Sequence, residues 1–303
     1  MSRFDVLILG NSSALPAYNR HPSAQLINIH EQLLLIDCGE GTQDRLIKHR
    51  VKSHKINHIF ISHLHGDHYF GLPGLITSLN LTGRKDPLHI YSPPGLDKLI
   101  IDIIGLADSH LNFEIFWKNL TGDESMILLD DGVKKIMAFP LKHRIATYGF
   151  VIKEAPGKRA FDADKFIELP SYKVINKLKQ GLNVLTDDGE LFKYEDYTLP
   201  PRPSRKYSYC SDTAYEPGLV AYIEGSDTLY HEATYAEIHL EKAKENFHST
   251  AIQAANIALK SKAKKLIIGH FSSRYKSLDM LLEEARSVFA ETVLAVEGHW
   301  YPV

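Results

Sequence analysis

The sequence predicts a layered α/β domain, and three observations lead to this prediction. Short apolar runs with strand composition recur along the 303 residues and alternate with runs that have helical spacing. Side chains that can bind metals follow several of these strand-like runs. A proline-rich stretch with many lysines and arginines and a small excess of positive charge, 153–206, interrupts the alternation. We therefore expect one domain over 1–303 with an inserted arm at 153–206.

The first half of the chain contains strands joined by hairpins and helices. The apolar run 4–9 ends at Gly10, and the runs 24–29 and 32–36 are close enough to form a hairpin. The segment 95–107 has leucine and isoleucine on one helical face. The other expected elements of this part are strands at 56–61, 88–91 and 134–143, and helices at 42–49 and 70–81.

The C-terminal third repeats the alternation. A helix at 249–260 begins at Ser249 or Thr250, which are favourable N-cap residues. The final strand is expected to begin at Thr292. The other expected elements are strands at 207–210, 228–230 and 265–269, and a helix at 277–290.

The arm differs in composition from the rest of the chain. It contains five prolines and little apolar periodicity, except for an expected helix at 172–179 that carries Lys173, Lys177 and Lys179. Two interpretations remain open: a solvated lobe, or a clamp that binds a substrate.

Overall composition excludes some classes of protein. The apolar fraction of 44% is normal for a globular domain, and the formal charge of -2 gives no global signature of a nucleic-acid binder. Two cysteines, Cys38 and Cys210, are too few for a disulfide framework. No apolar run approaches the length of a membrane span, so we expect a cytoplasmic protein with no membrane partner.

The most informative stretch is 62–68, Ser-His-Leu-His-Gly-Asp-His, which follows the strand at 56–61. His63 and His65 can converge on one metal ion. Beyond a turn that Gly66 allows, Asp67 and His68 can face a second ion. This density of ligands predicts a site for two metals.

Further ligand-type residues follow other strands. His143, Asp212 and His270 each stand at or near a strand end, and together with the 62–68 stretch they provide the donors that a two-metal site requires. Asp37 also stands where a strand passes into a loop. It either supports a ligand or caps a turn.

These residues lead to a family resemblance. The 63–68 stretch resembles the signature of the metallo-β-lactamase superfamily, and the spacing of His143, Asp212 and His270 matches as well. More specifically, the chain resembles tRNase Z, also called ribonuclease Z, in its short form. The motifs that carry this narrower resemblance lie at 200–205, 231–234, 248–250 and 269–275.

The resemblance implies a four-layer αβ/βα sandwich with an inserted flexible arm. It also implies a zinc-dependent endoribonuclease that removes the 3′ trailer from precursor tRNA and leaves a 3′-hydroxyl on the tRNA. Two Zn2+ per subunit are expected, with Mn2+ or Fe2+ as alternatives. The implied ligands are His63, His65 and His143 for one ion, Asp67, His68 and His270 for the other, and Asp212 as the bridge.

The resemblance further assigns catalytic and binding roles. Asp67 is expected to be the general base, and His248, held by Glu232, to protonate the leaving 3′ oxygen. A structural role at a helix start is the alternative for His248. Arg274 either contacts a phosphate or forms a salt bridge. The resemblance also implies a homodimer in which Lys173, Lys177 and Lys179 of the arm contact tRNA.

The chain departs from the family pattern in three places. Tyr18 and His21 replace a lysine and an asparagine in an early loop linked to the CCA end, so the resemblance does not specify how CCA-bearing precursors are treated. The arm has Pro170-Ser171 where the family usually has glycine-proline. Ser211 replaces the glycine that commonly precedes the bridging aspartate.

Two other functions remain open at this stage. A metallo-hydrolase of a lactone, a thioester or a cyclic nucleotide would need the same metal ligands but no arm. A non-catalytic RNA-binding scaffold would keep an inert metal site. The sequence also leaves the balance between endonuclease and exonuclease activity open.

Overall fold

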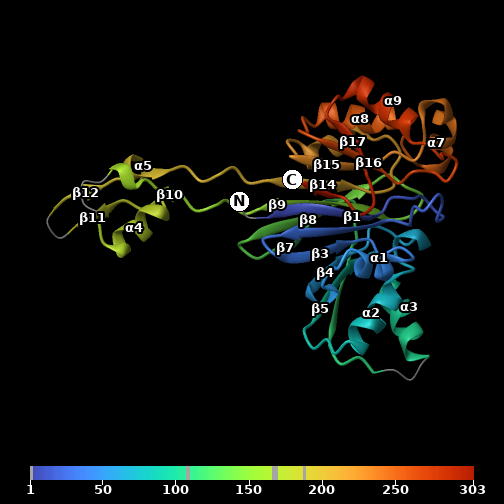
Figure 1. Cartoon of the computed structure of the whole chain (residues 1–303), viewed down its shortest axis with the longest axis horizontal. Helices are drawn as coiled ribbons and strands as arrows, with labels where there is room; N and C mark the ends of the chain where they lie inside the picture. The colour runs from blue at the N-terminus through green and yellow to red at the C-terminus, as the bar shows by residue number, and fades with distance from the viewer. Residues whose placement is uncertain (1–2, 107–109, 166–169, 187–188) are drawn as a thin grey trace.

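The computed structural model describes residues 3–106, 110–165, 170–186 and 189–303. Figure 1 shows a main body made of two sheets with helices on both outer sides, from which the arm extends. The strand orders are β18-β1-β2-β3-β4-β5-β6 in one seven-stranded sheet and β17-β16-β15-β14-β9-β8-β7 in the other. This is the four-layer sandwich that the sequence analysis predicts.

The first sheet and its helices come mainly from the N-terminal part of the chain. The strands β1, β2 and β3 are antiparallel neighbours, whereas β3 to β6 run parallel. The strands are β1 (Phe4–Gly10), β2 (Ala24–Ile29), β3 (Gln32–Ile36), β4 (Ile56–Phe60), β5 (Leu88–Ser92), β6 (Ile115–Asn119) and β18 (Trp300–Pro302). The helices are α1 (Thr42–Lys48), α2 (Leu72–Leu81) and α3 (Leu96–Gly105).

The second sheet comes from the rest of the chain. Its strands are β7 (Met126–Asp130), β8 (Lys134–Leu141), β9 (Thr147–Glu154), β14 (Lys206–Cys210), β15 (Thr228–Glu232), β16 (Leu266–Gly269) and β17 (Thr292–Leu294). Its helices are α6 (Val220–Ile223), α7 (Leu240–Asn246), α8 (Ala251–Lys260) and α9 (Asp279–Val288). Thr250 caps α8 in a capping box with Gln253.

Three apolar layers hold the body together. Strand β1 shows why its sequence is a continuous apolar run: Val6 and Ile8 pack between the sheets, whereas Leu7 and Leu9 pack toward the helices. Both faces of the central strands are therefore buried. The core between the sheets joins residues of both, such as Phe4, Ile27, Phe150, Tyr209 and Ile267.

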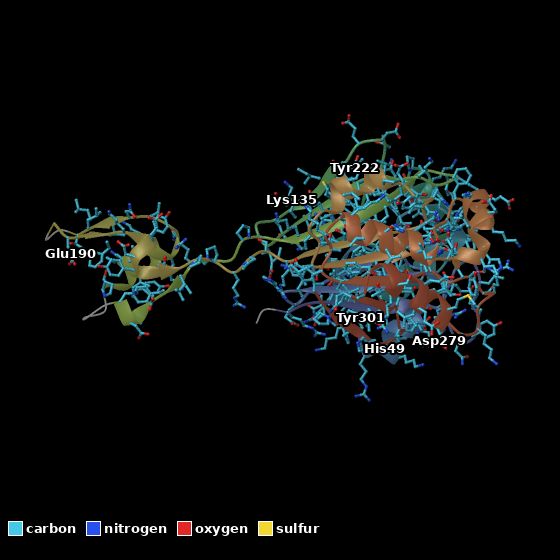
Figure 2. All side chains as sticks on the ribbon, turned by 90° about the horizontal axis from the view of Figure 1, so that it is seen from above. His49, Lys135, Glu190, Tyr222, Asp279 and Tyr301 are labelled. Atoms are coloured by element: carbon cyan, nitrogen blue, oxygen red, sulfur yellow. The ribbon has the colours of Figure 1, made fainter. Side chains whose placement is uncertain are left out.

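The arm leaves the body between β9 and β14, so its first two residues and its last one belong to these strands. In Figures 1 and 2, extended segments connect it to the body, and Glu190 lies in the distant part. The predicted helix at 172–179 is confirmed as α4 (Tyr172–Lys179). The other elements are β10 (Ala160–Phe161), β11 (Val184–Leu185), β12 (Leu191–Phe192), α5 (Tyr194–Tyr197) and β13 (Thr198–Leu199).

The arm has a small core of its own. Leu178, Val184 and Phe192 are buried together, which the weak apolar periodicity of the sequence did not predict. At the root of the arm, Arg205 Nη2 donates to Glu154 Oε1 at 2.8 Å. The side chain of His30 also contacts this carboxylate.

One expectation about local structure is wrong. The strand at Thr292 is not the last one, because β18 follows it and pairs with β1 in the other sheet. The turn expected at Gly66 is present as the 3₁₀ turn Gly66–His68. A side chain at Gly66 would collide with the ring of Phe70, whose Cε2 atom lies 2.1 Å from the position of a built Cβ.

Single-turn 3₁₀ helices occur at Ser53–Lys55, Gly66–His68, Ala163–Lys165, Pro217–Leu219 and Glu237–His239. Ala107, the expected end of the helix at 95–107, lies outside the described residues. Both cysteines are buried and free. No helix within the described ranges is long and apolar enough to cross a membrane.

Candidate functional site

The predicted metal ligands lie on loops that follow four strands from both sheets. The 63–68 stretch follows β4, His143 follows β8, Asp212 follows β14, and His270 follows β16. Residues as distant as 63 and 270 in the sequence are thereby brought together. The strand ends hold the loops in place because each strand is hydrogen-bonded to neighbours within its sheet.

The first group of donors consists of His63, His65, His143 and Asp212, with one ligand atom of each within 4.8 Å of the others. Nε2 of His63 lies 3.0 Å from Nδ1 of His65. The same His65 nitrogen lies 3.3 Å from Nε2 of His143. Oδ2 of Asp212 lies 3.6 Å from His63 Nε2. These separations suit four donors around one ion.

The second group consists of Asp67, His68 and His270. Oδ2 of Asp67 lies 3.6 Å from His68 Nε2 and 3.5 Å from His270 Nε2. The other carboxylate oxygen of Asp212, Oδ1, lies 3.4 Å and 3.2 Å from the same two nitrogens. The two oxygens of Asp212 therefore face different groups, which is the arrangement that a bridging ligand requires.

Several of these donor atoms have no partner although they are buried. Within the described part of the chain, His68 Nε2, His270 Nε2 and Asp212 Oδ1 form no hydrogen bond. Unsatisfied buried polar atoms are rare because each costs about 1–3 kcal/mol. Three such atoms that point into one space fit a divalent metal ion.

Asp37 orients His68, so of the two interpretations from the sequence the support of a ligand is the correct one. His68 Nδ1 donates to Asp37 Oδ2 at 2.8 Å, which turns Nε2 toward the site. Asp37 also accepts hydrogen bonds from Ser62 and Tyr209. Its φ of 57° is in the left-handed region, a strained conformation that these hydrogen bonds stabilise.

Other ligands are held by groups that the sequence analysis did not identify. His143 Nδ1 donates to the carbonyl oxygen of Phe247 at 2.8 Å, and His270 Nδ1 donates to Thr234 Oγ1 at 2.9 Å. The backbone N–H of Ala14 donates to Asp67 Oδ2 at 2.7 Å. Thr234 lies in the 231–234 motif, but backbone groups such as those of Ala14 and Phe247 leave no signal in a sequence.

His248 and Glu232 lie at the edge of the ligand cluster. His248 Nδ1 donates to Glu232 Oε1 at 2.9 Å, and Glu232 is fully buried. Burial alone would raise the pKa of Glu232, but the positive charge of His248 and its hydrogen bond lower the pKa to about 2. His248 also forms a third donor group with Asp212 and His270.

The predicted substrate-binding residues lie outside the cluster. Arg274 is exposed, and no ion pair is found for it among the described residues. Lys173 and Lys177 are exposed on α4 and stand four residues apart on one helical face, whereas Lys179 is half-buried. The arm residues are therefore not part of the metal centre.

Comparisons with known proteins agree with this geometry. A family model described as Anti-Pycsar protein Apyc1 matches residues 4–154. Ribonuclease Z of Bacteroides thetaiotaomicron is 44% identical over 300 residues, which cover 98% of this chain and 95% of that protein. Ribonuclease Z of Bacteroides fragilis is 42% identical over 300 residues, with 98% of both chains covered. The chain belongs to the ribonuclease Z family.

Solved structures of similar proteins agree with this membership. The short form of human tRNase Z superposes on this chain with a TM-score of 0.72 at 30% sequence identity. The match covers 99% of this chain and 100% of the human chain. The metallo-β-lactamase fold protein YhfI from Bacillus subtilis has a TM-score of 0.70 at 19% identity, which shows the fold. The family and the fold predicted from the sequence are both confirmed.

Two of the departures from the ribonuclease Z pattern, Ser211 and the early loop, form contacts within the fold. Ser211 is buried, and its hydroxyl lies 2.9 Å from that of Ser62, so the side chain joins the hydrogen bonds around Asp37. His21 Nδ1 lies 2.8 Å from Glu297 Oε2. The guanidinium of Arg20 stacks on the ring of Tyr18 at 5.3 Å. Both replacements in the early loop therefore contribute contacts to this chain's own fold.

Proposed function

We propose that the chain removes the 3′ trailer from precursor tRNA as a metal-dependent endoribonuclease. The observation that carries this proposal is the pair of donor groups with Asp212 between them, one carboxylate oxygen facing each group, in a chain of the ribonuclease Z family. We further propose that the two groups hold two Zn2+. His63, His65 and His143 would bind one ion, Asp67, His68 and His270 the other, and Asp212 would bridge them.

A pair of bound divalent ions lowers the pKa of water and offsets the negative charge of a phosphodiester transition state. The residues of the chain supply the remaining steps. Asp67 orients the attacking water or accepts its proton, and Ala14 holds one oxygen of the Asp67 carboxylate in place. Because water attacks instead of the ribose 2′-hydroxyl, the products are a 3′-hydroxyl on the tRNA and a 5′-phosphate on the trailer.

His248 donates a proton to the leaving 3′ oxygen through Nε2. Its Nδ1 is held by Glu232, which itself accepts hydrogen bonds from the backbone of Thr213, Thr234 and Ser249. Glu232 is therefore fixed, and it fixes the direction of the imidazole. The role of Glu232 is to position His248.

The arm is proposed to bind tRNA outside the cleavage site. Lys173 and Lys177 support this role because they are exposed on one face of α4 and can contact phosphates. Lys179 and Arg274 are proposed as further phosphate contacts. We also propose that the protein acts in the cytoplasm as a homodimer.

One assay tests the function directly. Metal-loaded protein is incubated with a precursor tRNA that carries a short 3′ extension, and the ends of the products are mapped. A tRNA with a 3′-hydroxyl and an intact trailer with a 5′-phosphate are expected, with no cleavage by Asp67→Ala. Hydrolysis of a small phosphodiester without cleavage of the precursor would contradict the proposal and favour a small-molecule hydrolase.

A further inference from the structure

A cavity of about 310 Å³ lies beside His248. Its walls include Lys142, Tyr215, Lys244, Phe247, His248 and Gln253, but none of the seven expected metal ligands. His248 therefore lies between the metal centre and this cavity. The proposed reaction assigns no role to the cavity. This volume is at the lower end of the range for small-ligand sites.

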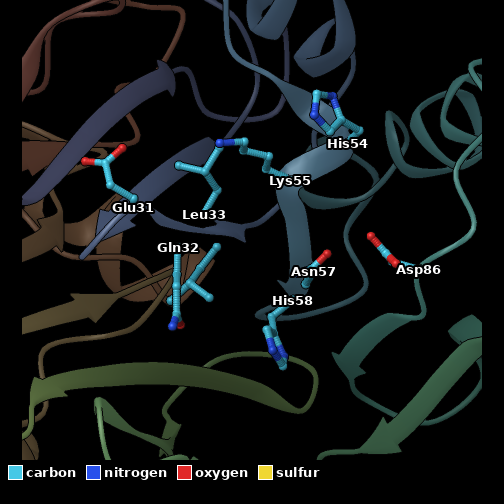
Figure 3. Close-up of a pocket in the computed structure, with 9 residues that line it drawn as sticks. Glu31, Gln32, Leu33, His54, Lys55, Asn57, His58 and Asp86 are labelled. Carbon is cyan, nitrogen blue, oxygen red and sulfur yellow. The ribbon is translucent and has the colours of Figure 1, made fainter.

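The cavity differs from the one drawn in Figure 3. That cavity, of about 290 Å³, is lined by residues such as Glu31, Gln32, Lys55 and His58. These residues lie around the beginning of β4, whereas the metal centre follows the end of this strand. The cavity in Figure 3 is thus at the opposite end of the strands, so of these two cavities the one beside His248 adjoins the metal centre.

The walls beside His248 combine aromatic rings, an amide and positive charge. The rings of Tyr215 and Phe247 are half-buried, so they offer apolar surface for stacking. The side-chain oxygen of Gln253 accepts from the backbone N–H of Thr250, while its amide nitrogen has no hydrogen-bond partner in the described part of the chain. Such a nitrogen is a donor available to a ligand.

The lysines add charge at the rim of the cavity. Lys142 and Lys244 are exposed, and their only ion pairs among the described residues are to the exposed side chains of Glu216 and Glu241. Exposed pairs of this kind are weak, at about 0–1 kcal/mol, so both ammonium groups can contact phosphates. Aromatic faces, an amide donor and cations are together the chemistry that binds a nucleotide.

The position of the cavity indicates which nucleotide it binds. On the proposed function, His248 protonates the leaving 3′ oxygen, so the sugar that carries this oxygen must lie within hydrogen-bond distance of His248. We propose that the cavity binds the nucleoside attached to that sugar, which is the last nucleotide retained in the mature tRNA, and that its base stacks on Tyr215. Lys260 holds the Tyr215 ring, because its Nζ donates to the hydroxyl at 2.8 Å.

Kinetics with two precursor tRNAs test this assignment. One substrate is intact, and the other lacks only the base of the nucleotide that carries the leaving oxygen, with its ribose and phosphate retained. For the metal-loaded wild type, loss of the base is expected to raise KM about tenfold, the scale of one base–aromatic stack. Tyr215→Ala should have the raised KM already with the intact substrate. Its KM for the abasic substrate should be no higher.

Two further variants distinguish the loss of the aromatic ring from a general folding defect. Tyr215→Phe retains the ring and should discriminate between the substrates like the wild type. Tyr215→Leu fills similar volume without a ring and should behave like Tyr215→Ala. A matched control is Phe116→Ala, which removes an exposed ring on the edge strand β6, far from the cavity in sequence and sheet position. This control should discriminate like the wild type.

The same discrimination should appear in equilibrium binding of mature tRNA that ends at this nucleotide. Wild type should bind the intact product about tenfold more tightly than the abasic product, and Tyr215→Leu should bind both equally. Undiminished discrimination by Tyr215→Ala and Tyr215→Leu would overturn the cavity assignment alone. Failure of the wild type to cleave either precursor would instead overturn the proposed function.

Discussion

His248 is the residue whose role is easiest to separate from that of a metal ligand. Because its Nδ1 is bonded to Glu232, replacement by alanine removes a proton donor but none of the seven expected ligands. His248→Ala is expected to lower kcat for precursor tRNA about 10²- to 10⁴-fold. Zinc content, measured by mass spectrometry of the dialysed protein, is expected to stay at the wild-type value.

The control for this prediction is His54→Ala, which removes an exposed histidine before β4. It should change neither kcat nor zinc content. Since Asp212, His248 and His270 also form a donor group, loss of zinc from His248→Ala would show that His248 is a ligand. That result would contradict its role as the proton donor.

Ser211 is connected to His68, one of the expected ligands, through a chain of hydrogen bonds. The Ser211 hydroxyl lies 2.9 Å from Ser62 Oγ, and Ser62 donates to Asp37, which orients His68. Loss of a residue that hydrogen-bonds a metal ligand typically weakens metal binding about 10- to 100-fold. Ser211 acts through Ser62 and Asp37, so Ser211→Ala is expected to weaken zinc binding by no more than about tenfold, the lower end of this range. Competition with a chromophoric chelator measures this change.

Ser287→Ala, in an exposed position on α9, is the matched control and should leave zinc affinity unchanged. An unchanged affinity in Ser211→Ala would mean that Asp37 and Ser62 hold His68 without the additional hydroxyl. In that case Ser211 would only fill the space that glycine leaves open in other members of the family.

At the residue level, the sequence predicted the side chains of the site better than their supports. The ligand-type residues stand out because histidine and aspartate after apolar strands are unusual, and the structure brings all seven of them together. The supports of His143 and Asp67 are backbone groups of Phe247 and Ala14. Their placement depends on left-handed φ angles of 57° and 59°, which side-chain identity does not predict.

The arm is the element whose contribution can be removed most cleanly. Strand β10 pairs with β13, so a deletion must remove both strands to leave no unpaired edge. Replacement of 158–199 by a short glycine-serine linker is expected to raise KM for precursor tRNA at least about tenfold at physiological salt and to flatten its salt dependence, because phosphate contacts are lost. Hydrolysis of bis-p-nitrophenyl phosphate should persist.

The ion pair between Glu154 and Arg205 remains in this deletion, so the ends of β9 and β14 stay joined. The thermal unfolding midpoint of the body is the control measurement and should match that of the full chain. If hydrolysis of both substrates falls together, the arm is required for folding of the body, and its proposed role in tRNA binding is wrong.

Among the secondary-structure elements, prediction was most accurate where the local pattern of apolar and polar residues determines the structure. The hairpin at 24–29 and 32–36 and the helix at 172–179 have the predicted bounds. The edge strands β6 and β7 were not predicted, because they are partly exposed and lack a continuous apolar run. Strand β18 was missed because it has only three residues and is defined by its pairing with β1.

At the scale of the whole molecule, the metal centre connects the two sheets. The ligands at 63–68 follow a strand of the first sheet, whereas His143, Asp212 and His270 follow strands of the second. Ions bound between them would therefore join loops from both sheets. A bound ion would satisfy the three donor atoms that have no partner among the described residues. Metal binding should thus stabilise the complete fold as well as supply chemistry.

Removal of the metal tests this coupling. At a metal concentration about 100-fold above Kd, binding adds about 2.7 kcal/mol to the free energy of unfolding. In a chain of this size, whose unfolding entropy is about 0.6 kcal/mol per kelvin, that corresponds to about 4 °C in Tm. Dialysis against a chelator should lower Tm by this amount, added Zn2+ should restore it, and differential scanning calorimetry measures both steps.

Asp212→Asn should abolish most of the shift because both groups lose their shared carboxylate, whereas Asp279→Asn on the exposed start of α9 should keep it. A wild-type Tm that does not respond to chelation would contradict the assignment of these residues as ligands, because residues that bind an ion in the folded state alone must stabilise that state.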